Sequence, residues 1–205
     1  MQKPIIVGIA GGSASGKSTL TAALTDALLT VPGRRVSVMA TDRYMNTERV
    51  GSPTFVFKAT GEAMFNANHP DSVDWERLVS DLDAERFAVD RPDVILLEGL
   101  MVLHAPRLRE YLDLRLFIEL DADERALRRL LRDMQGGRAS RDPGFIASYY
   151  LECARQGHAR YVEPSRVHAD LILRGDADWE RLRPLLLAVV EDRLACADSP
   201  DRHTS

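Results

Sequence analysis

The segment that most constrains this chain is an octapeptide close to its amino terminus. It reads Gly11-Gly12-Ser13-Ala14-Ser15-Gly16-Lys17-Ser18 and fits the pattern G-x-x-x-x-G-K-[ST]. An apolar run from Ile5 to Ala10 precedes it. Apolar residues at helical spacing follow it, namely Leu20, Ala23, Leu24, Ala27 and Leu28. The sequence therefore predicts a strand, a glycine-rich turn and a helix in direct succession.

Such a turn is typical of a phosphate-binding loop. Residues with little side chain let backbone N–H groups surround an anion, and the start of the next helix favours negative charge. We expect the cradle to extend through Thr19, with the Lys17 ammonium near the terminal phosphates and the Ser18 hydroxyl on Mg²⁺. A chance match in a Gly/Ser-rich turn is the alternative, and the flanking strand and helix argue against it. The expected ligand is a nucleoside triphosphate.

Strand-like and helix-like segments alternate along the rest of the chain. The strand-like runs are Ile5 to Ala10, Arg35 to Thr41, Val94 to Leu97, Leu114 to Leu120 and Leu171 to Leu173. Helical patterns cover Lys17 to Leu29, Val73 to Leu82, Ala122 to Met134, Phe145 to Val162 and Trp179 to Ala195. This alternation predicts an α/β fold with a parallel five-stranded sheet flanked by helices. We expect one domain over residues 1–205, with a frayed polar tail at 198–205.

Composition narrows the function classes. A net charge of −4 gives no global basic field, so we expect no nucleic-acid partner. No apolar run approaches the length of a membrane span, and the first strand begins too early to leave room for an export signal. Cys153 and Cys196 are isolated, which suits a reducing compartment and a cytoplasmic location. The oligomeric state stays open, with a homo-oligomer among the alternatives.

Two carboxylates follow predicted strands. Asp42 comes directly after the second strand, and Glu98 ends the third. Because the carboxyl ends of parallel strands form the ligand-binding edge of such a sheet, we expect both acids to lie near the cradle. Asp42 is the candidate base that accepts a proton from the attacking hydroxyl, and Glu98 is the candidate metal partner; both are candidate Mg²⁺ ligands together with Ser18. A turn-capping role for Asp42 and an exposed position for Glu98 are the alternatives.

An arginine-rich helix follows the fourth strand. Arg125, Arg129 and Arg132 fall on one helical face, and a glycine-containing segment with Arg138 and Arg141 comes next. We interpret residues 135–145 as a mobile lid whose arginines close over the phosphates and stabilise the charge that develops during transfer. Arg129, Arg132 and one of Arg138 or Arg141 are the candidates for this role. For Arg125 and Arg128 we favour a solvated face paired with nearby acids.

These motifs, taken in order, resemble the uridine kinase family of P-loop kinases, which belongs to the phosphoribulokinase and uridine kinase superfamily. The resemblance rests on these segments: Gly8 to Thr19, Thr41-Asp42-Arg43-Tyr44, Asn68-His69-Pro70-Asp71, Leu97-Glu98-Gly99, Asp121 to Asp133 and Ala169 to Gly175. It implies transfer of the γ-phosphate of ATP, with Mg²⁺, to a hydroxyl of a small molecule. By the same resemblance Asp42 is the base, and Asp42, Tyr44, Asn68, His69 and Arg129 contact the acceptor.

The chain departs from the family pattern where the acceptor binds. Uridine kinases carry an aspartate before His-Pro that holds the ribose hydroxyls, whereas this chain has Asn68. Their aromatic and histidine-bearing hairpin before the Glu-Gly turn is absent here. The leading expectation is a nucleoside such as uridine or cytidine; the alternatives are nicotinamide riboside, pantothenate, a sugar, or a non-catalytic nucleotide sensor. His69 is either a substrate contact or a loop anchor, and the segment from Phe55 to Phe65 forms an acceptor pocket, a hairpin or an edge helix.

Overall fold

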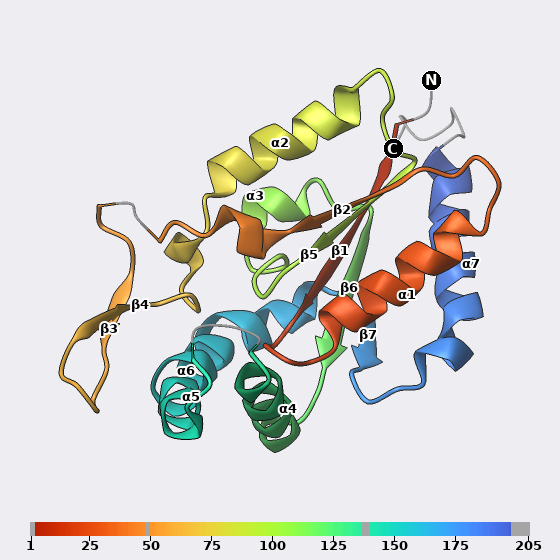
Figure 1. The fold of residues 1–205 in the computed structure, drawn as a ribbon. Helices are drawn as coiled ribbons and strands as arrows, with labels where there is room; N and C mark the ends of the chain where they lie inside the picture. Colours follow the sequence, from red (N-terminus) through yellow and green to blue (C-terminus); the bar gives the residue numbers. More distant parts are fainter. Residues whose placement is uncertain (1–2, 48–49, 137–139, 198–205) are drawn as a thin grey trace.

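The computed structural model describes residues 3–47, 50–136 and 140–197. Its centre is a five-stranded sheet in the order β2-β5-β1-β6-β7, in which every neighbouring pair is parallel (Figure 1). The strands are β1 (Ile5–Gly11), β2 (Val36–Ala40), β5 (Val94–Glu98), β6 (Leu114–Glu119) and β7 (Leu171–Arg174). The predicted parallel five-stranded sheet is confirmed. The central place of β1 puts the turn that follows it in the middle of the carboxyl-terminal edge.

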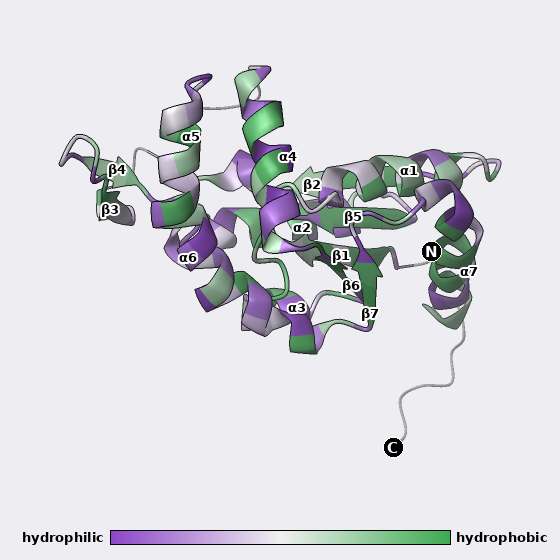
Figure 2. Ribbon diagram, turned by 90° about the horizontal axis from the view of Figure 1, so that it is seen from below, coloured by the Kyte–Doolittle hydropathy of each residue, from purple (hydrophilic) through white to green (hydrophobic). Residues whose placement is uncertain are grey.

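Helices cover both faces of the sheet. Helices α1 (Lys17–Leu29) and α7 (Trp179–Ala197) pack on one face, and α2 (Trp75–Phe87) and α3 (Pro106–Arg109) pack on the other. Side chains of β1 alternate between two cores: Ile5, Val7 and Ile9 join the α1 and α7 side, whereas Ile6 and Ala10 join the α2 and α3 side. Figure 2 shows the hydrophobic residues concentrated on the strands. Burial on both faces explains why the central strands read as continuous apolar runs.

Two helices and a small hairpin lie beyond the carboxyl-terminal edge of the sheet, whereas the chain that leads into β7 runs back along the face covered by α3, where Val162 is buried (Figure 1). Helix α4 (Ala122–Met134) follows β6, and α5 (Pro143–Tyr149) packs beside it. The chain continues through a π-helical turn at Tyr150–Ala154, α6 (Arg155–Gly157), a second π-helical turn at His158–Val162 and a 3₁₀ helix at Glu163–His168. Shorter 3₁₀ turns occur at Thr41–Tyr44 and Pro70–Ser72. An antiparallel hairpin of β3 (Thr54–Val56) and β4 (Ala63–Phe65) projects from this end.

The predicted elements match the observed ones, with small shifts at their ends. Helix α2 begins at Trp75, where Asp74 caps it by accepting the Arg77 N–H, and it continues to Phe87, five residues past the predicted end. The long helix after the predicted lid begins at Pro143 and contains two π-helical turns that the sequence did not indicate. The segment around Phe55 forms the hairpin, one of its three open alternatives. The tail at 198–205 lies outside the described residues. No helix in residues 3–47, 50–136 and 140–197 is long and apolar enough to cross a membrane.

Candidate active site

A cavity of about 550 Å³ opens at the carboxyl-terminal edge of the sheet. Three turns that follow β1, β2 and β5 form one end of it, and helices α4 and α5 with the hairpin form the other. The predicted site residues on its wall are Ser13, Ala14, Gly16, Lys17, Ser18, Thr19, Asp42, Asn68, Glu98, Arg129 and Arg132. The parallel sheet thus brings most of the predicted set into one hollow, at the edge where parallel sheets hold their ligands.

The turn after β1 has the backbone shape of a phosphate-binding loop. Gly16 has φ of +103°, a left-handed conformation that costs glycine little, and its carbonyl accepts the Leu20 N–H at 2.9 Å to start α1. Gly11 has φ of +145° and Ala14 has φ of +62°. The Lys17 ammonium donates to the Gly12 carbonyl at 2.7 Å, so the cation lies over the loop. Backbone donors, a helix start and a cation therefore converge on one spot, which suits a polyphosphate.

Strand register brings the two candidate carboxylates beside this loop. In β5, Glu98 lies opposite both Ile9 of β1 and Ala40 of β2, and Asp42 follows Ala40 by two residues. The Ser18 hydroxyl donates to Glu98 Oε1 at 3.1 Å, and the Thr21 hydroxyl lies 3.3 Å from Glu98 Oε2. Among the described residues, no group of three or more His, Cys, Asp or Glu side chains is placed to hold a metal. A hydroxyl beside a carboxylate fits Mg²⁺, which proteins commonly bind through one or two carboxylates together with phosphate oxygens and water.

Helix α4 carries three arginines to the cavity. The buried Asp133 carboxylate organises two of them: Arg129 Nε lies 3.4 Å from Oδ2, and Arg132 Nη2 lies 2.8 Å from Oδ1. The Arg129 guanidinium also lies over the Tyr149 ring, 5.2 Å from its centroid. Because Asp133 is only 4% exposed and the Arg129 side chain only 13%, this pair is shielded from solvent, whereas the Arg132 side chain is 36% exposed. The arrangement suits the predicted binding of phosphate charge by Arg129 and Arg132.

The expectation of a solvated face paired with acids is wrong for Arg125 and holds only in part for Arg128. Arg125 is 6% exposed, donates from Nε to the Leu120 carbonyl at 3.0 Å, and packs against the backbone of Gly12. Arg128 does pair with Glu124, at 2.6 Å, but it also lines the cavity and donates to the Gly175 carbonyl at 2.9 Å. Helical spacing alone does not reveal which side of α4 meets the loop after β1. The parallel pairing of β6 with β1 determines which side of α4 contacts the phosphate-binding loop.

His158 completes the packing against the back of the phosphate-binding loop. Its Nδ1 is buried, has no hydrogen-bond partner among the described residues, and lies against Gly12. Its Nε2 lies 3.2 Å from Glu163 Oε2. Burial, followed by the charges of Arg125 and Lys17, lowers the pKa of His158 to about 4. The imidazole is therefore neutral at pH 7 and adds no positive charge behind the loop.

This neutral histidine predicts a dependence of stability on pH. Below about pH 6.5 the unfolded chain binds a proton at His158, whereas the folded protein binds it only near pH 4. The contribution of neutral His158 to the free energy of unfolding is therefore complete above pH 6.5. It is lost as the pH falls towards 4, and the loss is roughly 2–3 kcal/mol. We expect His158→Phe to reduce this loss, as measured by urea unfolding at pH 7 and pH 4.5. The exposed His168 gives the comparison: burial also lowers its pKa, but without the large shift of His158, so His168→Gln should reduce the slope less than His158→Phe does. Equal slopes for wild type and His158→Phe would contradict the assignment.

The turn after β7 closes over the phosphate-binding loop from a distant part of the sequence. A Cβ at Gly175 would overlap the Ser15 carbonyl oxygen, so only glycine allows this approach. Gly175 N–H donates to the Glu119 carbonyl at 2.7 Å, and the Gly175 carbonyl accepts from Arg128. The position of the loop after β1 therefore depends on the turn after β7, which α4 holds in place.

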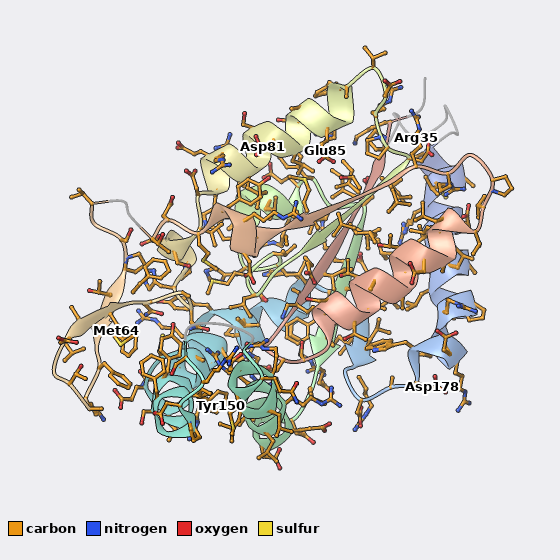
Figure 3. The ribbon with its side chains drawn as sticks, in the orientation of Figure 1. Arg35, Met64, Asp81, Glu85, Tyr150 and Asp178 are labelled. Atoms are coloured by element: carbon orange, nitrogen blue, oxygen red, sulfur yellow. The ribbon has the colours of Figure 1, made fainter. Side chains whose placement is uncertain are left out.

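The far end of the cavity is apolar and aromatic. Its wall is formed by Met45, Met64, Phe65, Phe145, Ile146 and Tyr149. Aromatic contacts join the hairpin to α5: Phe55 meets Tyr149 edge-on with ring centroids 5.5 Å apart, and Phe57 lies 5.2 Å from Phe145. Figure 3 shows Met64 on this hairpin, on the same side of the molecule as the α5 side chains. Of this wall, the sequence predicts only the hairpin segment as a candidate; the spacing of Phe145, Ile146 and Tyr149 is the signal that would add α5.

The structure does not bring every predicted residue to the cavity. The Tyr44 hydroxyl lies 3.0 Å from Asp81 Oδ2 on α2, and burial together with this carboxylate raises the pKa of Tyr44 to about 12. His69 Nδ1 accepts the Asp71 N–H at 3.2 Å while its ring packs edge-on against Tyr161, the position of a loop anchor. Arg141 lies beside Gly136, outside the cavity wall. Arg138 falls outside the described residues, and the motion of the lid stays a prediction.

The fold and the loop with its lysine, paired carboxylate and arginines define a P-loop kinase that transfers a phosphoryl group to a hydroxyl. A model of the "Phosphoribulokinase / Uridine kinase family" matches residues 44–178, and the chain belongs to this family. A uridine kinase of Deinococcus deserti is 34% identical over an alignment of 198 positions, which covers 83% of this chain and 87% of that one. A uridine kinase of Chlamydia pneumoniae is 32% identical over an alignment of 223 positions, which covers 98% of this chain and 95% of that one. The resemblance inferred from the motifs is confirmed.

Solved structures agree on the fold. A Silicibacter sp. TM1040 protein described as a proposed fructose transport system kinase superposes with a TM-score of 0.64 at 21% identity. The match covers 84% of this chain and 90% of that one. At this identity the likeness establishes the arrangement of strands and helices, while the acceptor has to be inferred from the cavity itself.

Proposed function

We propose that this protein is an ATP- and Mg²⁺-dependent nucleoside kinase that phosphorylates a ribose hydroxyl of a uridine-like or cytidine-like acceptor. One observation carries the proposal: a single cavity joins the phosphate-binding loop, Asp42 and Glu98 to an apolar aromatic wall. The loop end suits a triphosphate and the aromatic end suits a flat base, because aromatic side chains pack well against planar rings. Sugars without a base and pantothenate offer no such ring. The relatives named uridine kinase point the same way.

The proposed reaction is a direct transfer of the γ-phosphoryl group. Asp42 accepts the proton of the attacking hydroxyl, whose oxygen then forms the new bond to phosphorus while the bond to the β-phosphate oxygen breaks. Lys17, Arg129 and Arg132 stabilise the charge on the phosphoryl oxygens. Ser18 and Glu98 would hold Mg²⁺, which supplies charge neutralisation at the β- and γ-phosphates. A cytoplasmic location, the absence of a nucleic-acid partner and the oligomeric state remain predictions.

A panel of acceptors tests this proposal. ADP formation with ATP and Mg²⁺ is measured with uridine, cytidine, nicotinamide riboside, pantothenate and fructose at equal concentrations. We expect turnover with uridine or cytidine, at least tenfold above the other acceptors and above the rate without acceptor. Turnover with another acceptor alone would keep the kinase chemistry and reject the nucleoside assignment. Binding of ATP with no turnover for any acceptor would identify a nucleotide sensor instead.

A further inference from the structure

A buried polar cluster lies directly behind the acceptor end of the cavity. Asn68 Nδ2 donates to Cys153 Sγ at 3.3 Å, and Cys153 Sγ donates to Asn66 Oδ1 at 3.1 Å. The Tyr149 hydroxyl is hydrogen-bonded to the same thiol. Asn68 and Tyr149 line the cavity, whereas Cys153, which is 2% exposed, does not. The π-helical turn at Tyr150–Ala154 carries the thiol to this place.

The cluster fixes which end of the Asn68 amide faces the cavity. A thiol has one donor, and Asn66 Oδ1 takes it, so the sulfur can only accept from Asn68. Burial raises the pKa of Cys153, which keeps the thiol protonated and preserves this direction. With Nδ2 bound to the sulfur, Asn68 Oδ1 has no hydrogen-bond partner in the part of the chain that the structure describes. Asn68 is only 5% exposed but lines the cavity, so Oδ1 is the atom of this amide that a ligand in the cavity can use.

We propose that Cys153 is a positioning residue for the acceptor: it holds the Asn68 amide so that the side-chain carbonyl accepts a hydrogen bond from an acceptor hydroxyl that does not react. This inference rests on the proposed nucleoside kinase activity, and the hydroxyl belongs to the ribose. An amide that turned over would present its NH₂ group, which only donates, so the ribose hydroxyl would have to accept a hydrogen bond there instead of donating one. The thiol therefore selects a donor in the substrate without touching it.

Two sets of variants test the role of Cys153. Cys153→Ala and Cys153→Val remove the hydrogen bonds, while Cys153→Ser keeps one donor and an acceptor. We expect the first two to raise the KM for uridine about fivefold, as expected for one hydrogen bond, and to leave kcat and the KM for ATP unchanged. Cys153→Ser should restore the wild-type KM. The exposed Cys196 provides the matched control, since Cys196→Ala should change none of these constants.

Replacing the amide itself separates orientation from packing. In Asn68→Asp the side chain has two equivalent acceptor oxygens, so no partner is needed to choose between them. Adding Cys153→Ala to Asn68→Asp should change the KM for uridine by less than about twofold. If Cys153 acted through packing, the double variant would instead show the same rise in KM as Cys153→Ala alone. Discrimination between uridine and its 2′- and 3′-deoxy analogues should also fall in Cys153→Ala.

The outcomes distinguish this inference from the proposed function. If the wild-type protein phosphorylates no nucleoside, the proposed function fails and this inference fails with it. If wild type phosphorylates uridine but Cys153→Ala and Cys153→Val keep its KM, only the positioning role is overturned. If Cys153→Ala raises the KM for uridine equally in wild type and in Asn68→Asp, the positioning role is overturned as well. That result would mean that Cys153 acts through packing.

Discussion

Asp42→Asn should bind ATP as wild type does and yet transfer phosphate roughly 10²–10⁴-fold more slowly, the range typical for loss of a general base. Asparagine keeps the shape of the side chain but cannot accept the proton of the attacking hydroxyl. The structure supports the choice of Asp42 because it lines the cavity two residues beyond Ala40, which lies opposite Glu98 in the sheet. Single-turnover transfer of labelled γ-phosphate measures the chemical step, and calorimetry measures ATP binding.

Asp26→Asn is the matched control for this experiment. Asp26 lies on the exposed side of α1, so the same loss of charge there should change neither rate nor affinity. A wild-type rate for Asp42→Asn would move the role of base to Glu98, whose carboxylate lies next to the Ser18 hydroxyl. A rate that falls only in proportion to weakened ATP binding would instead make Asp42 a binding residue.

Lys17→Ala should lower kcat by roughly 10²–10³-fold, the effect of removing one preorganised donor from a developing charge. The Lys17 ammonium is positioned by the Gly12 carbonyl and lies within the loop that would hold the phosphates. Because the interaction strengthens as charge moves onto the phosphoryl oxygens, we expect a larger effect on kcat than on the Kd for ATP. Steady-state kinetics measures kcat, with the acceptor that the panel identifies. Calorimetry measures the Kd for ATP.

Lys3→Ala controls for the loss of one positive charge. Lys3 is exposed before β1, at the opposite end of that strand from the loop. Its replacement should leave kcat unchanged. Retained turnover in Lys17→Ala would reject the role of this lysine in transfer and would leave Arg129 and Arg132 as the cations that act on the phosphates.

The sheet and its main helices were predictable from sequence because each strand is covered on both faces. Ile5–Gly11 and Val94–Glu98 form strands that are buried almost throughout, and such burial leaves a continuous apolar run in the sequence. The positions of Asp42 and Glu98 were predictable for a related reason, since each follows such a run and parallel strands end at one edge. Two rules therefore predicted the sheet and the polar end of the cavity: buried strands leave apolar runs, and parallel strands end at one edge.

The acceptor end was less predictable because it depends on contacts between distant segments. Asn68 and Cys153 are 85 residues apart, and neither spacing nor charge links an asparagine to a thiol in sequence. His158 meets Gly12 only after the helical segment that follows α4 folds back towards the phosphate-binding loop. The burial of Arg125 likewise follows from its contact with Gly12, which its position in the helical pattern does not predict. Pairings of this kind are set by tertiary structure, which single-sequence patterns do not encode.

The contact between Gly175 and Ser15 has a consequence for the order in which a ribosome produces a working protein. The phosphate-binding loop leaves the ribosome first, but the glycine that abuts it is made about 160 residues later, after β6 and α4. Nascent chains that stop before this glycine lack the buttress and should not retain nucleotide. We therefore expect competence to bind the triphosphate to arise late in synthesis, once β7 and the turn after it have formed.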